Sequence, residues 1–282
     1  MGNNGGNLTL LNSSVLDSTA TNQGGGIHNP TGTLTLANST VSGNSTTSTG
    51  TVRSGGGIFT QSGSVRLTNS TVSENSTGAY GDGGGIYTNS GDVTLTSSTV
   101  SGNSTTSDDR DGGGIFTQSG SVRLTNSTVS GNSSGRYGGG IFTETGTAAL
   151  NNSTVSGNSS DRFGGGIASR SGTVRLNNST VSGNSSTGTS AGGGGIFAFR
   201  GAVLVENSTI TGNTSDAAGG GIDSFSGNVT LTNSTVSGNT SGNDGGGIFT
   251  DDGAVLIENS TIAGNTSFGE GGGIGFLSLI HI

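Results

Sequence analysis

The sequence predicts an all-β protein in which about ten coils stack along one axis, each coil with three short parallel strands. The first observation is a repeat: Gly-Gly-Gly-Ile recurs along the chain, at spacings from 26 residues (Ile115 to Ile141) to 31 residues (Ile27 to Ile58). Such fixed-period similarity indicates a solenoid. The second is that an Asn stands seventeen residues after each of these Ile residues except the last, whereas the interval from that Asn to the next Ile varies. Each coil is therefore a constrained body followed by a loop that tolerates insertions.

The composition agrees with a solenoid better than with a conventional globular core. Of 282 residues, 59 are Gly and 27% are hydrophobic, and no Cys is present. A chain so rich in Gly and Ser would otherwise suggest disorder, but apolar residues that return at fixed offsets let stacked coils share one core. The net charge of −8 argues against a nucleic-acid partner, since phosphates call for a basic surface. No run of residues is long and apolar enough to span a membrane.

The three strands can be placed within one coil. The first begins at Ile58 and ends before the turn at Gly63. The second holds Val65 and Leu67, which alternate with polar residues as in a half-buried strand. The third surrounds Val72, and the odd separation from Leu67 requires a bend. Asn69 is the expected corner, because Asn tolerates the left-handed conformation. Helices are not expected, since β-branched residues, Gly and Ser dominate.

The Asn residues at the fixed offset are expected to stack as a hydrogen-bonded ladder along the rod. They could also be glycosylation sequons, but sugar attachment would not require a constant position relative to the core. The expected ladder consists of Asn44, Asn75, Asn103, Asn132, Asn158, Asn184, Asn213, Asn239 and Asn265.

A mostly aromatic stripe follows the Ile residues by one position. It consists of Phe59, Tyr87, Phe116, Phe142, Phe197 and Phe249, and is interrupted by His28, Ala168, Asp223 and Gly275. If Ile points inward, alternation sends the stripe outward, where aromatic rings could bind sugar rings or a partner protein. We favour the alternative that a bulge at the Gly run turns the rings inward, where they stack on one another.

Acidic residues gather in the variable loops, and Asp108, Asp109 and Asp111 are the best candidates for a Ca²⁺ site. The alternative is a solvated loop that keeps a Gly-rich rod soluble, and we prefer it. No other cofactor is expected. Asp251 and Asp252 form an acidic pair, but sequence cannot give the carboxylate separation that glycoside hydrolysis needs.

The third strand presents Thr and Ser on its outer face, as at Thr71 and Ser73. This hydroxyl array resembles the Thr-x-Thr faces of ice-binding β-helices. Thr and Ser also suit any exposed strand, so ice binding is the third of the functions that we consider.

The repeat follows the phrase GGGI(F/Y)T…VxLxNSTVSGN, which resembles the repeats of right-handed parallel β-helix proteins of the bacterial surface and secreted type. These include polymorphic outer-membrane proteins and the passenger regions of autotransporters. The resemblance covers residues 1–276 and implies a right-handed parallel β-helix, in line with the usual hand of parallel crossovers. It also implies a bacterial protein that is extracellular or on the cell surface.

These observations favour a non-catalytic rod that acts as a structural spacer or as an adhesin-like binding surface, with a polysaccharide or a surface protein as partner. No acid, base and nucleophile converge in the sequence. The alternative is a Ca²⁺-dependent polysaccharide lyase-like carbohydrate enzyme.

Residues 1–276 are expected to form a single domain that is truncated at both ends, because Met1 stands where a 26-residue period would place an Ile. Residues 277–282 break the repeat and are expected to be a non-native tail. Open strand edges at two cut ends would favour end-to-end association.

Overall fold

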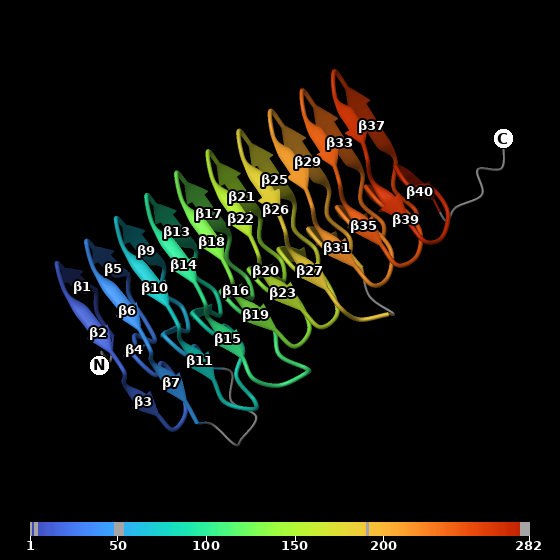
Figure 1. Cartoon of the computed structure of the whole chain (residues 1–282). Coiled ribbons are helices and arrows are strands. Elements are labelled where there is room, and N and C mark those ends of the chain that lie inside the picture. Colours follow the sequence, from blue (N-terminus) through green and yellow to red (C-terminus); the bar gives the residue numbers. More distant parts are fainter. Residues whose placement is uncertain (1, 3–4, 48–53, 190–191, 277–282) are drawn as a thin grey trace.

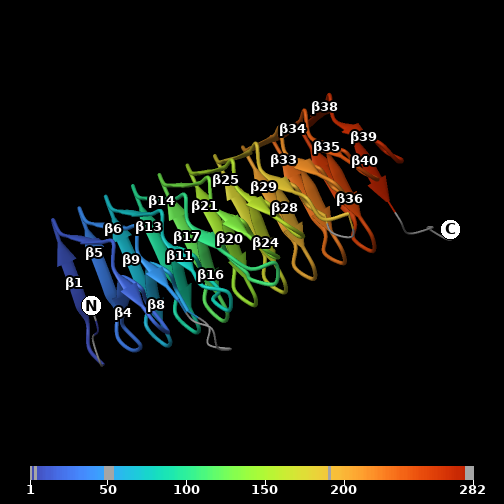
Figure 2. The same cartoon turned by 60° about the horizontal axis from the view of Figure 1, so that its bottom comes forward.

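The computed structural model describes residues 2, 5–47, 54–189 and 192–276 and shows a rod of coils stacked side by side (Figure 1). All strands of this part of the chain lie in four parallel sheets of ten strands each, and it contains no helix. The described residues therefore include no helix that could cross a membrane. A view from a second direction shows the same single row of coils running from the first strands to the last (Figure 2). The predicted all-β parallel β-helix is confirmed.

Sheet A contains the strands that begin at the repeated Ile. Its ten strands are β4 (Ile27–His28), β8 (Ile58–Thr60), β12 (Ile86–Thr88), β16 (Ile115–Thr117), β20 (Ile141–Thr143), β24 (Ile167–Ser169), β28 (Ile196–Ala198), β32 (Ile222–Ser224), β36 (Ile248–Thr250) and β40 (Ile274–Phe276). From β8 to β32, all three residues of each strand are buried.

Sheet B contains the strands with the alternating apolar pair. They are β1 (Leu8–Leu11), β5 (Leu34–Ala37), β9 (Val65–Thr68), β13 (Val93–Thr96), β17 (Val122–Thr125), β21 (Ala148–Asn151), β25 (Val174–Asn177), β29 (Val203–Glu206), β33 (Val229–Thr232) and β37 (Val255–Glu258). In β9 the burial alternates as predicted, with Val65 and Leu67 inside and Arg66 outside.

Sheet C contains the strands around the third apolar position. They are β2 (Ser14–Leu16), β6 (Thr40–Ser42), β10 (Thr71–Ser73), β14 (Thr99–Ser101), β18 (Thr128–Ser130), β22 (Thr154–Ser156), β26 (Thr180–Ser182), β30 (Thr209–Thr211), β34 (Thr235–Ser237) and β38 (Thr261–Ala263). The bend between sheets B and C lies at the expected corner, where Asn69 has a φ of +48°.

Sheet D corrects the expected three strands per coil to four. It contains β3 (Thr19–Ala20), β7 (Ser45–Thr46), β11 (Ser76–Thr77), β15 (Ser104–Thr105), β19 (Ser133–Ser134), β23 (Ser159–Ser160), β27 (Ser185–Ser186), β31 (Thr214–Ser215), β35 (Thr240–Ser241) and β39 (Thr266–Ser267). The inner residue of β11 is Thr77, which is buried and donates its hydroxyl to the carbonyl of Gly81 at 2.8 Å. Hydrophobic alternation misses this strand because it buries a hydroxyl instead of an apolar side chain.

The core is one ladder of aliphatic side chains that stack in register. In adjacent coils Ile115 pairs with Ile141, Val122 with Ala148 and Leu124 with Leu150, and all of these side chains are buried. Burying an aliphatic side chain contributes about 1.5–3 kcal/mol, but one coil alone would leave both faces of its core open. The coils are therefore stable only as a stack.

The Asn residues form the expected ladder. Asn132 is buried, and its backbone N and side-chain Nδ2 both donate to the Oδ1 of Asn158 in the next coil, at 3.0 and 2.9 Å. The same Nδ2 also donates to the carbonyl of Val100 at 3.1 Å. A parallel ladder of serines runs beside it: the backbone N of Ser127 donates to the Oγ of Ser153 at 3.1 Å. These side chains satisfy backbone groups at the bends, where the sheets cannot.

The Gly run lies against the Asn ladder. A β-carbon at Gly165 would collide with the carbonyl of Ser185 in the following coil, and one at Gly166 would lie 2.9 Å from the Cγ of Asn184. The second and third glycines are therefore required because backbone and ladder approach so closely.

Candidate functional site

The aromatic stripe follows the middle residues of sheet A and lies inside the wall of the rod. Its first five rings, Phe59, Tyr87, Phe116, Phe142 and Phe197, are buried, and only Phe249 is half-buried. The rings of Phe59, Tyr87 and Phe116 stack almost in parallel, with centroids 5.4 and 5.0 Å apart. The alternative of an exposed contact stripe is therefore wrong for the first five rings. They are buried and stack on one another, as the packing alternative expected, in a cluster separate from the aliphatic core.

The stack starts at His28, whose ring lies 5.3 Å from that of Phe59 and parallel to it. Burial lowers the pKa of His28, and the positive N-terminus lowers it further. This histidine is therefore a neutral packing ring at physiological pH and not a candidate acid.

One interruption of the stripe, at Ala168, is filled by rings from elsewhere. Tyr137 and Phe163 precede two of the Gly runs, and their rings stack 4.9 Å apart. Tyr137 continues the column from Phe142 at 5.1 Å, and Phe163 reaches Phe197 at 4.6 Å. The two rings thus replace the one that Ala168 lacks. Sequence reasoning missed them, although aromatic residues directly before a Gly run are a signal that could have found them.

The next interruption, at Asp223, is not filled by any side chain of the described residues, and a cavity of about 480 Å³ opens there. In the register of sheet A, Asp223 lies between Phe197 and Phe249. Six aromatic rings line the cavity, those of Tyr137, Phe163, Phe197, Phe199, Phe225 and Phe249. We call this cavity the Asp223 pocket. Phe199 and Phe225 stack on each other 4.9 Å apart at its edge, and Phe225 is exposed.

Asp223 itself is 8% exposed and lines the pocket. None of the described residues donates a hydrogen bond to its carboxyl group. Burial raises the pKa of Asp223 to about 8, and the negative charge of Asp251 contributes to the rise. A carboxyl group that stays protonated at neutral pH beside a second carboxylate is an arrangement often found at functional sites. Gly192 leaves the room for it, since a β-carbon there would collide with Oδ2 of Asp223.

The described lining of the pocket holds three acidic residues, Asp223, Asp244 and Asp251, and no Arg or His. Oδ1 of Asp244 also accepts a hydrogen bond from the backbone N of Glu270 at 2.6 Å, which fixes that side chain at the rim. The pocket combines aromatic faces with negative charge. Such a site accepts neutral or cationic rings and repels anionic ones.

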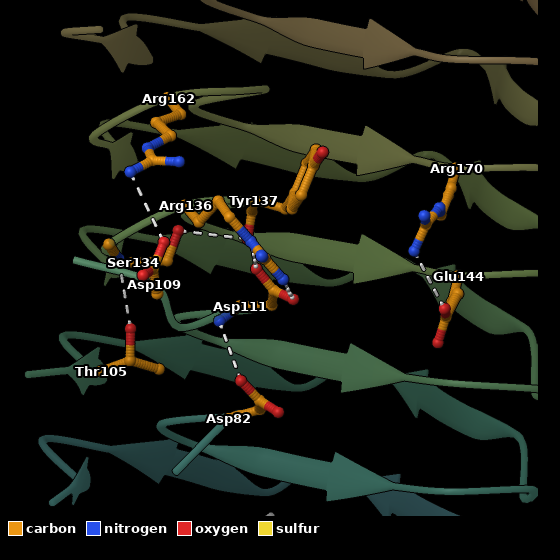
Figure 3. Close-up of polar contacts among 11 residues, drawn as sticks. Asp82, Thr105, Asp109, Asp111, Ser134, Arg136, Tyr137, Glu144, Arg162 and Arg170 are labelled. Atoms are coloured by element: carbon orange, nitrogen blue, oxygen red, sulfur yellow. Dashed lines mark hydrogen bonds and ion pairs between the residues drawn. The ribbon is translucent and has the colours of Figure 1, made fainter. Parts of the chain in front are cut away.

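The Ca²⁺ candidates lie elsewhere, in the loop that ends at Asp111 (Figure 3). The carboxylate of Asp111 receives two hydrogen bonds from Arg136, at 3.0 and 2.8 Å. Asp109 pairs with Arg162 at 3.4 Å, where both side chains are exposed. Asp108 lines a separate hollow with Asp161. No cluster of three potential metal ligands occurs in the part of the chain that the structure describes, and arginines already neutralise two of the three candidates.

The acidic loop supports the pocket indirectly. The hydrogen bonds that Arg136 donates to Asp111 raise the pKa of Arg136, and its guanidinium lies 5.0 Å from the ring centroid of Tyr137. Tyr137 in turn lines the Asp223 pocket. Asp111 thus has a structural role that its position in an acidic loop did not predict.

The outer hydroxyls of sheet C stack in register, as the repeat predicted. Thr128 pairs with Thr154 and Ser130 with Ser156, and these side chains are half-buried. Some of the hydroxyls bond to each other, such as Ser73 to Ser42 at 3.1 Å. This face is regular but has no hollow or charge that would identify a ligand.

The comparison with known protein families agrees with this architecture. The sequence profile of the family described as right-handed β-helix region matches residues 1–169 and 165–277. Among solved structures, an alginate lyase from Paenibacillus sp. str. FPU-7 is similar at 11% sequence identity and a TM-score of 0.33, over 93% of this chain and 99% of the lyase. No curated protein matches the sequence.

Proposed function

The chain belongs to the right-handed β-helix family, and from that premise we propose that it is a non-catalytic binding rod that holds a polysaccharide in the Asp223 pocket. The observation that carries the proposal is the pocket itself. It is a cavity of about 480 Å³ lined by six aromatic rings and three carboxyl groups. Aromatic faces stack on the apolar faces of sugar rings, while a few polar groups fix their orientation, as is usual for ligand sites.

The rest of the rod acts as a spacer in this proposal. Strands such as β9 and β10 of sheets B and C present polar side chains at regular intervals, and the coils share one continuous core. We place the protein outside the cell or on its surface, as an adhesin-like rod, because its repeats resemble those of bacterial surface proteins. A surface protein is the alternative partner.

Binding measurements test the proposal. Purified rod is titrated with oligosaccharides of neutral, cationic and anionic sugars, and Phe249→Ala and Phe225→Ala are compared with the wild type. We expect one class of oligosaccharide to bind, and we expect both variants to weaken binding by about tenfold through loss of stacking. If no oligosaccharide binds, the proposal is wrong.

A carbohydrate-cleaving enzyme is the second candidate, and one observation favours it. Asp223 is buried with a pKa raised to about 8, so it holds a proton at neutral pH, and the carboxylate of Asp251 is near enough to contribute to that rise. Glycosidases use such a pair, one carboxyl group as acid and the other as base or nucleophile. Release of reducing ends from a bound oligosaccharide, and its loss in Asp223→Asn, would replace the binding proposal with this one.

The Ca²⁺-dependent lyase variant of this candidate has less support. Asp109 and Asp111 pair with arginines, and the described residues hold no cluster of three ligands. Ice binding stays third, resting only on the regular hydroxyls of sheet C.

A further inference from the structure

We infer that the Asp223 pocket receives one ring of a cationic amino sugar, which takes the place of the aromatic ring missing between Phe197 and Phe249. This inference rests on the proposed function and specifies its ligand. The argument has three steps, which concern the spacing of the rings, the other gap in the same column and the charge of the pocket.

The spacing suits a single ring. Successive rings in the intact part of the column have centroids 5.0 to 5.4 Å apart. Phe197 and Phe249 belong to strands β28 and β36, which are separated by β32. Two steps between adjacent strands amount to about 10 Å along the axis. One ring in the middle of this interval would contact a face on each side at the distance found elsewhere in the column.

The protein itself fills the other gap in the aromatic column. At Ala168 the missing ring is replaced by Tyr137 and Phe163, so that the contacts from Phe142 to Phe197 are continuous. At Asp223 none of the described side chains fills the space, and a cavity remains among them. An open gap among apolar faces leaves their surface in contact with water, and a ring from a ligand would cover it.

The charge of the pocket selects a cation. Asp223 is 8% exposed, faces the cavity and has no hydrogen-bond donor among the described residues. A buried carboxyl group without a hydrogen-bond partner is unfavourable, and a ligand ammonium would supply a donor and a positive charge that lets Asp223 release its proton and pair as a carboxylate. Asp251 and Asp244 add negative charge around the same cavity. An ammonium on the ring would also be attracted to the faces of the surrounding phenylalanines.

The same charge disfavours acidic sugars. A uronate ring would bring its carboxylate next to Asp223 and Asp251, where the described lining offers no arginine to balance it. A neutral N-acetylated ring could stack and donate hydrogen bonds, but it would bring no positive charge to the acidic lining. The expected order of affinity is therefore amino sugar, then N-acetylated sugar, then uronate.

Isothermal titration calorimetry at neutral pH and low salt tests the inference with three probes: short glucosamine oligomers, their N-acetylated counterparts and oligogalacturonate. We expect the glucosamine oligomers to bind at least about tenfold more tightly than the N-acetylated ones, the size of one charge-assisted contact. If the N-acetylated oligomers bind as well, the charge step is overturned while the proposed function stands. If none of the probes binds, both are overturned.

Two variants test the place of the ring. Asp223→Phe continues the column with the residue type found in neighbouring coils, so it should fold, fill the gap and abolish binding. Asp223→Asn keeps the shape of the pocket and removes the carboxyl group that could give up its proton to pair with the ammonium, and it should lower affinity for glucosamine oligomers by about tenfold. Asp252→Asn is the matched control, since Asp252 is an exposed neighbouring acid outside the pocket lining. Unchanged binding in Asp223→Phe would show that the sugar ring binds elsewhere. Equal losses of affinity in Asp223→Asn and Asp252→Asn would show that only the overall charge of the rod matters.

Discussion

The side-chain Nδ2 of Asn132 donates to the Oδ1 of Asn158 in the next coil at 2.9 Å, and the Oδ1 of Asn132 accepts the same bond from Asn103 at 2.9 Å. Each Asn from Asn75 to Asn239 therefore connects three consecutive coils. Because the side chains are buried, removing one of them would leave its partners without water to replace it.

Substitution of Asn132 by Ala is expected to lower the free energy of unfolding by about 3 kcal/mol, because the amide of Asn103 and the carbonyl of Val100 lose their partners. Urea denaturation followed by circular dichroism measures the change. Asn151→Ala, an exposed asparagine at the end of β21, is the control and should differ little from wild type. Equal stability of the two variants would contradict a stabilising ladder.

Two glycines should respond to alanine in different ways. Gly165→Ala places a β-carbon against the carbonyl of Ser185 and should cost about 3 kcal/mol or more. Gly157 has a φ of +62° but open space around it, so Gly157→Ala should cost only about 1 kcal/mol for the left-handed backbone. Thermal unfolding of both proteins checks the order. Glu74, which has a φ of +56° at the equivalent corner, shows that a side chain is tolerated there.

The stability of the rod should depend on pH through Asp223. The pKa of Asp223 in the folded rod is about 8, above the ordinary value of 3.8. Its contribution to the free energy of unfolding is therefore fully present below about pH 4 and is lost as the pH rises toward 8. Asp223→Asn should therefore be more stable than wild type at pH 7, by at least about 1 kcal/mol, and the difference should shrink toward pH 4. The titratable groups that line the same cavity are Asp244, Asp251 and Tyr137, and both proteins retain them. Unfolding measured at several pH values in the two proteins gives the comparison, and a difference that is constant with pH would refute the assignment.

Arg136→Ala is expected to destabilise the rod by about 2 kcal/mol, because it leaves the buried carboxylate of Asp111 without its bidentate partner. Arg162→Ala breaks an exposed pair with Asp109 and should cost less than about 0.5 kcal/mol. Chemical denaturation of the two variants separates a structural ion pair from a surface one. A calcium titration of the wild type belongs to the same experiment, and a clear binding isotherm would restore the Asp108 to Asp111 loop as a metal site.

Aromatic residues of the column should affect the stability of the rod, whereas those at the rim of the pocket should affect oligosaccharide binding. Phe116→Ala removes a ring that is 1% exposed and should lower stability by about 4 kcal/mol. Phe225 is 43% exposed, so Phe225→Ala should change stability by less than about 1 kcal/mol while weakening oligosaccharide binding. Stability and affinity measured on the same preparations reveal whether the two classes exist.

The sequence predicts most of the architecture because the repeat places residues at constant offsets. The Ile ladder, the Asn ladder and the corner at Asn69 all follow from residue type and spacing alone. Sheet D does not, because Thr77 and its equivalents are buried hydroxyls whose partners are backbone carbonyls, and such partners leave no hydrophobic pattern.

The site was harder to predict because it arises from exceptions to the repeat. Asp223 could be identified as an interruption of the aromatic stripe, but nothing in the sequence indicates that Tyr137 and Phe163 fill one interruption and leave another open. That difference depends on where two variable loops return to the wall of the rod. Burial of the stripe likewise does not follow from alternation, because the rings form a cluster separate from the aliphatic core, with Tyr137, Phe163 and Phe199 packed against it.

The fit of Tyr137 and Phe163 to the position left by Ala168 also bears on how the chain finds its correct pairing. Because neighbouring units are nearly identical, a strand that skips one unit during folding would satisfy almost the same hydrogen bonds, and the competing arrangements would be close in energy. Slipped arrangements would separate Tyr137 and Phe163 from the space at Ala168, and they would place Asp223 beside different neighbours. They would therefore differ in energy from the correct arrangement. The irregular coils thus favour the correct alignment of the repeats over alignments that would otherwise have nearly the same energy.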